Sequence, residues 1–171
     1  MGDVVRAYVA AHPYEEPAFD LYPVEDVLPG VGLGRVGALP EQMCVRLLAG
    51  QAAEVYEVPG VTWSGDGDAM VQRVGVLPGS GRGCIENAAG QCDALITSDM
   101  AYHDADQAAE KGVALIDVPH GEFEWWAFKR WVGTLPEEFV GGKVAVTVSQ
   151  EWQSPWSQLW GGGRLEGRRR G

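Results

Sequence analysis

The chain has 171 residues, of which 46% are hydrophobic, and this length and composition suit one globular domain or one domain with an appendage. Its formal net charge of −11 argues against nucleic acid or an anionic membrane as a partner, because both attract basic surfaces. No stretch has the ~20 apolar residues of a membrane span or the pattern of a signal peptide, and the three cysteines have no metal-finger spacing, so we expect a reduced, cytoplasmic protein.

Residues 1–40 have the pattern of a short α+β segment. Their β-branched and aromatic side chains predict a strand over residues 4–11. An acidic turn follows, and a second short strand is predicted over residues 19–24. The glycine-rich stretch 28–37 predicts a loop.

Part of that loop, GLGRVG (32–37), has the G-x-G-x-x-G spacing of a dinucleotide-binding turn. Such a turn needs a strand that leads into it and a helix that leaves it. Pro29 before the motif opposes a buried strand, and Pro40 falls where the helix would already be running. We therefore interpret GLGRVG as a connection that uses glycine for its backbone freedom, and not as a nucleotide site.

Residues 41–160 show strands alternating with helices, which predicts an α/β fold, a layered sheet with crossover helices. The predicted helices are 41–50, 84–92, 102–112 and 121–135, and the predicted strands are 53–58, 71–79, 93–98, 113–118 and 142–149, with a flexible connection over 59–69. Continuous apolar runs mark strands that are buried on both faces. We therefore expect Leu115, Ile116, Val144 and Val146 in the core. Residues 161–171 carry almost nothing apolar and predict a disordered tail.

A second glycine-rich stretch, GSGRG (79–83), lies where a predicted strand runs into a helix. Backbone N–H groups at such a point can form an anion-binding nest. No Walker pattern is present, because Gly-Lys-Ser/Thr does not follow. Two interpretations stay open: a tight turn between strand and helix, or a site for a substrate phosphate or carboxylate.

His120 and Glu124 form the sharpest candidate for a metal site. His120 follows the predicted strand 113–118, at the edge where open α/β sheets place ligands. Because the two residues are four apart, a helix would carry both side chains on one face. Imidazole nitrogen and carboxylate oxygen suit Zn²⁺, Mn²⁺ or Fe²⁺. The alternative is a helix N-terminus at which the helix dipole favours acidic residues.

Asp99 and His103 form a second candidate pair. Asp99 follows the predicted strand 93–98, and His103 begins the next helix beside Asp104. Neighbouring parallel strands end at one sheet edge, so we expect His103 and His120 to approach one another across adjacent loops. An acid/base group beside a metal is a common hydrolytic arrangement. The alternative is a helix cap and a hydrogen bond.

The stretch 93–124, DALITSDMAYHDADQAAEKGVALIDVPHGEFE, closely resembles the C-terminal part of the dinuclear-metal-centre hexameric family, the GTP cyclohydrolase 1 type 2 homologues. HPYEEPAFDLYPV (12–24), together with GLGRVG, resembles the second half of a PII-like domain that many bacterial members insert between two α/β halves. The resemblance implies a partial PII-like α+β insert over residues 1–40, a C-terminal α/β half-domain with the metal site over residues 41–160, and a tail over residues 161–171.

The resemblance also implies residue roles. In the family the equivalents of His120 and Glu124 bind two divalent metal ions, which would be Zn, Mn or Fe, and the equivalent of His103 lies at the site. We therefore predict His103 and Asp99 as catalytic groups. Ser98 and Pro119 stand where the family usually has glycine. The family's first half supplies the remaining ligands and has no counterpart in this sequence, so we expect weak or absent metal binding by this chain alone.

The implied function is divalent-metal binding in a homo-oligomer, a hexamer by resemblance, or together with a separate N-terminal half. The implied activity is that of a metal-dependent hydrolase on a nucleotide-like substrate. Two alternatives remain: a non-catalytic binding or regulatory module whose HPYEEP region makes the contacts, and a degenerate fragment without independent function.

Overall fold

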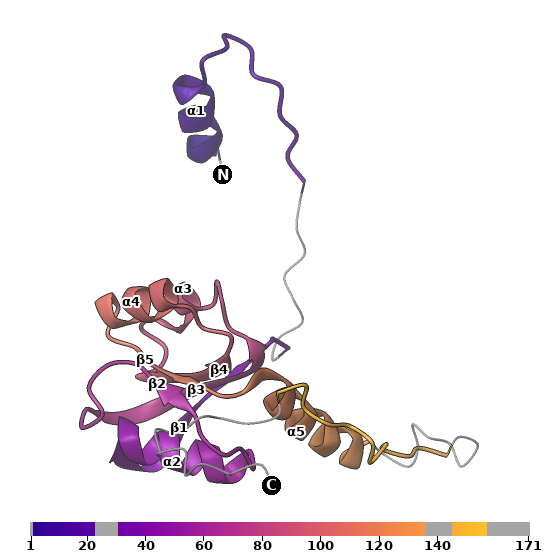
Figure 1. Cartoon of the computed structure of the whole chain (residues 1–171). Helices are drawn as coiled ribbons and strands as arrows, with labels where there is room; N and C mark the ends of the chain where they lie inside the picture. The colour runs from indigo at the N-terminus through magenta and orange to yellow at the C-terminus, as the bar shows by residue number, and fades with distance from the viewer. Residues whose placement is uncertain (1, 23–30, 136–144, 157–171) are drawn as a thin grey trace, which may run out of the picture. The chain divides into compact units, whose positions relative to one another are not determined.

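The computed structural model describes residues 2–22, 31–135 and 145–156 of the chain. The chain divides into two compact units, Met1–Gly32 and Leu33–Gly171. Figure 1 shows the helix of the first unit and the helices and strands of the second. Among the described residues, no helix combines the length and the apolar character needed to cross a bilayer.

The first unit contains the helix α1 (Gly2–Ala11), so the strand predicted over residues 4–11 is wrong. Val4 and Tyr8 are four apart and share one face of a helix, which satisfies its own backbone groups. A strand would need a pairing partner, and the described residues of this unit include no other strand. Residues 19–22 of the second predicted strand also have no regular structure, and residues 23–24 lie outside the described ranges.

The second unit is built on a mixed sheet with the strand order β1-β3-β4-β5-β2 among the described residues. Its strands are β1 (Arg35–Cys44), β2 (Thr62–Trp63), β3 (Met70–Ser80), β4 (Ala94–Ser98) and β5 (Ala114–Asp117). The three central strands β3, β4 and β5 pair in parallel, whereas β1 and β2 are antiparallel to their neighbours at the two edges. This arrangement confirms the predicted α/β fold.

Helices cover both faces of the sheet (Figure 1). They are α2 (Val45–Val55), α3 (Ile85–Ala88), α4 (Tyr102–Glu110) and α5 (His120–Gly133). One core cluster joins Ile96 and Ile116 of the sheet to α2 and α5. The other joins Leu95 and Leu115 to α3 and α4. Successive strand residues therefore alternate between the two layers, as the pleat requires, and the central strands are buried on both faces.

The region from residue 35 to residue 63 differs most from its predicted structure. Helix α2 begins at Val45 and runs to Val55, so residues 41–44 belong to β1 and the strand predicted over residues 53–58 is wrong. The buried residues of this helix recur at helical spacing, and the spacing continues past Gly50 to Ala52; they are Val45, Leu48, Ala49 and Ala52. The predicted connection 59–69 contains β2.

Strand β1 includes the last three residues of GLGRVG and continues through Pro40. It crosses the division at residues 40/41 that the sequence suggested. Proline is tolerated there because β1 is an edge strand and its register with β3 shifts between Ala38 and Met43. No helix follows the motif directly, so the arrangement of a dinucleotide-binding turn is absent. The loop predicted over residues 28–37 is wrong for residues 35–37, which pair with β3, and neither Gly34 nor Gly37 has the positive φ that this interpretation assumed.

Two of the four predicted core positions are confirmed. Leu115 and Ile116 are 2% and 0% exposed. The prediction for Val146 is wrong, because residues 145–149 form no strand and Val146 is 50% exposed. Apolar residues alone do not make a strand when no neighbouring strand pairs with them. Val144 and the predicted tail 161–171 lie outside the described residues.

We expect Leu115→Ala to lower the free energy of unfolding by about 2–5 kcal/mol, because it removes buried methyl groups and leaves a cavity beneath α4. Urea denaturation followed by circular dichroism would measure this change. Leu47→Ala is the matched control, since Leu47 is 62% exposed on α2 and its loss should cost less than about 0.5 kcal/mol. Equal effects of the two substitutions would contradict the placement of Leu115.

Candidate functional site

The parallel strands bring three chain segments to one edge of the sheet. Strand β3 ends at Ser80, β4 at Ser98 and β5 at Asp117. Ser80 lies opposite Ser98, and Thr97 lies opposite Asp117, so these ends are adjacent. The loop after β4 begins with Asp99, and α5 begins three residues after β5. Polar side chains distant in sequence therefore meet at the carboxyl ends of the strands.

At this edge the His120 imidazole lies between two carboxylates. Its Nδ1 is 2.7 Å from Asp99 Oδ2, and its Nε2 is 3.1 Å from Glu124 Oε1. The Glu124 contact follows from the helix, which carries residues four apart on one face. The Asp99 contact joins residues 21 positions apart and depends on the pairing of β4 with β5. We call Asp99, His120 and Glu124 the carboxylate–histidine cluster.

The backbone at Asp99 has an uncommon conformation that presents this carboxylate. Its φ is +59°, in the left-handed region, where a non-glycine residue costs of order 1–3 kcal/mol. Hydrogen bonds hold the turn in place. Arg82 Nε donates to the Asp99 carbonyl at 2.8 Å, and Gly81 N–H donates to the Ser98 carbonyl at 3.2 Å. Asp117 Oδ2 accepts from the Met100 N–H at 3.0 Å. The strained turn is thus anchored on the loop after β3 and on the last residue of β5.

Glycine at position 79 leaves the space that the Glu124 carboxylate occupies. A Cβ built on Gly79 would come within 2.7 Å of Glu124 Oε1, and the Gly79 φ of +88° also favours glycine. The same carboxylate would repel an anion at this point. Of the two interpretations of GSGRG, the structure therefore supports the tight turn, and α3 after it has only four residues.

The two carboxylates act on the His120 pKa. Burial of the ring by itself lowers this pKa, but the hydrogen bond to Asp99 and the charges of Asp99 and Glu124 outweigh burial. The net result is a pKa above the usual value near 6.5. Burial is the main cause that raises the pKa of the Asp117 carboxyl, and the nearby Asp99 charge adds to it. The edge therefore favours a positive charge at or near His120.

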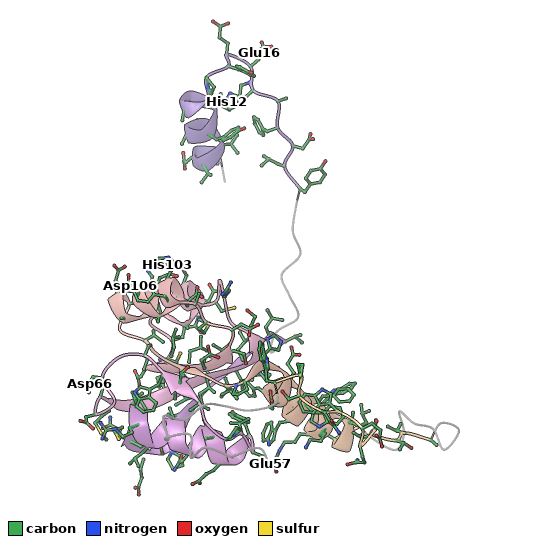
Figure 2. All side chains as sticks on the ribbon, viewed as in Figure 1. His12, Glu16, Glu57, Asp66, His103 and Asp106 are labelled. Carbon is green, nitrogen blue, oxygen red and sulfur yellow. The ribbon has the colours of Figure 1, made fainter. Side chains whose placement is uncertain are left out.

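The structure does not bring His103 into this cluster. His103 is exposed on α4 (Figure 2), and its ring contacts the neighbouring Tyr102 ring. It makes no hydrogen bond or ion pair with His120 among the described residues. Asp104 accepts the Ala101 N–H at 2.7 Å and lies 3.4 Å from Arg82 Nε. The His103–Asp104 pair thus lies in the first turn of a helix, where the Asp104 carboxylate accepts from the N-cap residue Ala101. This capping role was the alternative interpretation of the motif.

The cluster offers two converging side chains of the types that bind metals. His120 Nε2 and Glu124 Oε1 face one another, while Asp99 holds the other ring nitrogen, as carboxylates do behind metal-bound histidines. Within the described ranges, no three His, Cys, Asp or Glu side chains are grouped so that all could hold one ion. The sequence patterns predicted all three residues, but they predicted neither the direct Asp99–His120 hydrogen bond nor the role of Gly79. A glycine at the end of a strand was the only available signal for the latter.

Comparison with known proteins identifies a family and several relatives of this chain. The profile of the family Duf34/NIF3 (NGG1p interacting factor 3) matches residues 6–155. A Mycobacterium leprae protein named GTP cyclohydrolase 1 type 2 homolog is 41% identical over 160 residues, which cover 90% of this chain and 41% of the relative. A Bacillus subtilis protein of the same name is 39% identical over 118 residues, 68% of this chain and 32% of the relative.

Solved structures agree with the sequence relatives. The crystal structure of a Bacillus cereus protein related to NIF3 superposes with a TM-score of 0.65 at 32% identity, covering 92% of this chain and 44% of that chain. The chain spans about two fifths of the length of the mycobacterial relatives that it matches.

We expect Asp99→Asn to lower the His120 pKa in metal-free protein, because the substitution removes a charged hydrogen-bond acceptor and keeps the side-chain size. Histidine NMR signals followed against pH would measure the pKa. Asp106→Asn, on the exposed part of α4, is the control.

The raised His120 pKa should also make the free energy of unfolding depend on pH. Because the folded pKa of His120 is raised, its favourable contribution is complete below the unfolded value near 6.5 and is lost as the pH rises through the folded value. The stability difference between wild type and Asp99→Asn should therefore shrink with rising pH. An unchanged His120 pKa in Asp99→Asn would contradict the proposed electrostatics.

Proposed function

This chain belongs to the Duf34/NIF3 family, and we propose that it binds a divalent metal ion through His120 and Glu124 as part of a metal-dependent hydrolase. The observation that carries the proposal is the convergence of His120 Nε2 and Glu124 Oε1, 3.1 Å apart, at the carboxyl ends of the parallel strands. The relatives' name, GTP cyclohydrolase 1 type 2 homolog, supports a hydrolase that acts on a nucleotide-like substrate.

The donor set fits a borderline transition metal. One imidazole nitrogen and one carboxylate oxygen suit Zn²⁺, Mn²⁺ or Fe²⁺, whereas Mg²⁺ and Ca²⁺ prefer oxygen ligands alone. A bound ion of this kind supplies Lewis acidity and lowers the pKa of water. Asp99 would fix the His120 ring so that Nε2 points toward Glu124. His103 remains a prediction from resemblance for a catalytic group.

Two ligands leave most of a four- to six-coordinate shell to water or to other groups. The complete site, which by resemblance holds two metal ions, would take its other ligands from outside the described residues. We propose that they come from a separate N-terminal half or from other copies in a homo-oligomer, a hexamer by resemblance. None of the three cysteines forms a disulfide, which supports a cytoplasmic location.

A binding or regulatory role without catalysis is a second candidate, supported by the first unit. There Tyr8, His12, Tyr14 and Phe19 form a chain of ring contacts, and Tyr14 N–H donates to His12 Nδ1 at 3.1 Å. Tyr14 is 70% exposed, so it is available to a partner. The absence of any metal binding by the purified protein would favour this candidate.

We expect the purified chain to bind one Zn²⁺ or Mn²⁺ weakly, and His120→Ala to reduce the affinity by at least about tenfold, because one of two protein ligands is lost. Isothermal titration calorimetry would measure both. His12→Ala, the same substitution in the other compact unit, is the matched control. Tight binding of two ions that survives His120→Ala would show that other residues form the site.

A further inference from the structure

Four aromatic side chains line a cleft on the side of α5 toward the end of α2. Trp125 and Trp126 come from α5, Tyr56 follows α2, and Trp152 comes from the segment 145–156, which lies along α5 (Figure 1). The Trp125 and Trp152 rings stack at 5.5 Å and 14°. Tyr56 meets Trp126 edge-on at 4.9 Å and 90°. The aromatic cleft, as we call it, has a volume of about 160 Å³.

A carboxylate with one unpaired oxygen belongs to the same cleft. Glu122, also on α5, lines the aromatic cleft, and its Oε2 is shielded from solvent without a hydrogen-bond partner among the described residues. Native proteins rarely leave a buried polar atom unsatisfied, so such an atom calls for a ligand or another explanation. Glu57 supplies a second carboxylate, presented by a turn in which its φ is +58° (Figure 2).

These features together select for a particular ligand chemistry. Aromatic ring faces carry negative electrostatic potential and attract cations, most strongly when the site is partly desolvated. The carboxylates add to this potential, and the chain's net charge of −11 acts in the same direction. The volume lies below the roughly 300–1,000 Å³ of ordinary small-molecule pockets, so one small headgroup fits better than an extended ligand.

Cationic side chains are already close to these rings. Arg130 Cζ lies 4.4 Å from the centre of the Trp126 ring, which shows that this ring can accept a cation on one face. Lys129 lines the aromatic cleft and is exposed, but it forms no ion pair with Glu122 among the described residues. Lys129 would therefore compete with a cationic ligand for the cleft, but it does not neutralise Glu122 in this structure.

We propose that the aromatic cleft binds a small organic cation, a quaternary or methylated ammonium headgroup, with the charge of the Glu122 carboxylate as its counter-ion. The lining of the cleft includes neither His120 nor Glu124, so the proposal does not depend on metal binding. It gives a function to Trp125 and Trp126, two tryptophans of α5 that the metal site does not use.

Choline and its neutral isostere 3,3-dimethylbutan-1-ol test the proposal, because they share a shape and differ in charge. Each would be titrated into the full chain at constant ionic strength while the indole N–H NMR signals of Trp125, Trp126 and Trp152 are followed. Single Trp→Phe variants assign the signals. We expect choline to shift these signals saturably and the isostere to bind at least about tenfold more weakly. No saturable shift, or equal binding of the two compounds, would overturn the proposal.

Charge substitutions make the test specific to Glu122. Glu122→Gln keeps the side-chain shape and should weaken choline binding about tenfold, because the counter-ion is lost. Glu110→Gln removes the same charge from the exposed end of α4 and should change nothing. Lys129→Met should bind choline at least as tightly as wild type. His120→Ala should also retain choline binding, which separates this result from the outcome for the metal. Unchanged binding by Glu122→Gln, with a native circular dichroism spectrum, would contradict the assigned counter-ion.

Discussion

Parallel pairing of β3, β4 and β5 is the constraint on which the rest of the structure depends. Parallel neighbours cannot be joined by tight hairpins, so each connection crosses the sheet and carries a helix. The helices cover both faces, and strand residues such as Ile96 and Ile116 are fully or almost fully buried. All three strands must then end at the same edge. The meeting of Asp99 with His120 is a consequence of this pairing and not of any local motif.

The same sheet also offsets the free-energy cost of the left-handed backbone at Asp99. A left-handed aspartate persists only where surrounding interactions over-determine it. Hydrogen bonds from Arg82 and Gly81 to the turn, and from Met100 to Asp117, provide those interactions. The turn is therefore held before any ligand binds, which gives the His120 ring a defined orientation. A defined orientation is what a histidine needs if one ring nitrogen is to be kept for a metal.

Helix α5 carries a core contact and both proposed sites on three different faces. Phe123 is fully buried and packs the helix on the core. His120 and Glu124 point to the strand ends, and Trp125 and Trp126 line the aromatic cleft. The residues for different purposes are interleaved at neighbouring positions, since adjacent residues of a helix point about 100° apart. Both proposed sites thus share one rigid element, although neither lends a side chain to the other.

Local patterns in the sequence determined two kinds of element: helices, whose backbone hydrogen bonds are internal, and segments with a simple apolar period. The central strands, the helix of residues 120–133 and the proximity of His120 to Glu124 follow from such patterns, because helical spacing by itself sets the last of these. Tertiary structure decided whatever needs a partner distant along the chain. Residues 4–11 are apolar enough for a strand, but no strand pairs with them among the described residues, and the same holds for the exposed Val146. Stacking of Trp125 on Trp152 likewise joins residues that no local period relates, because only the burial of the whole core determines which distant segments meet.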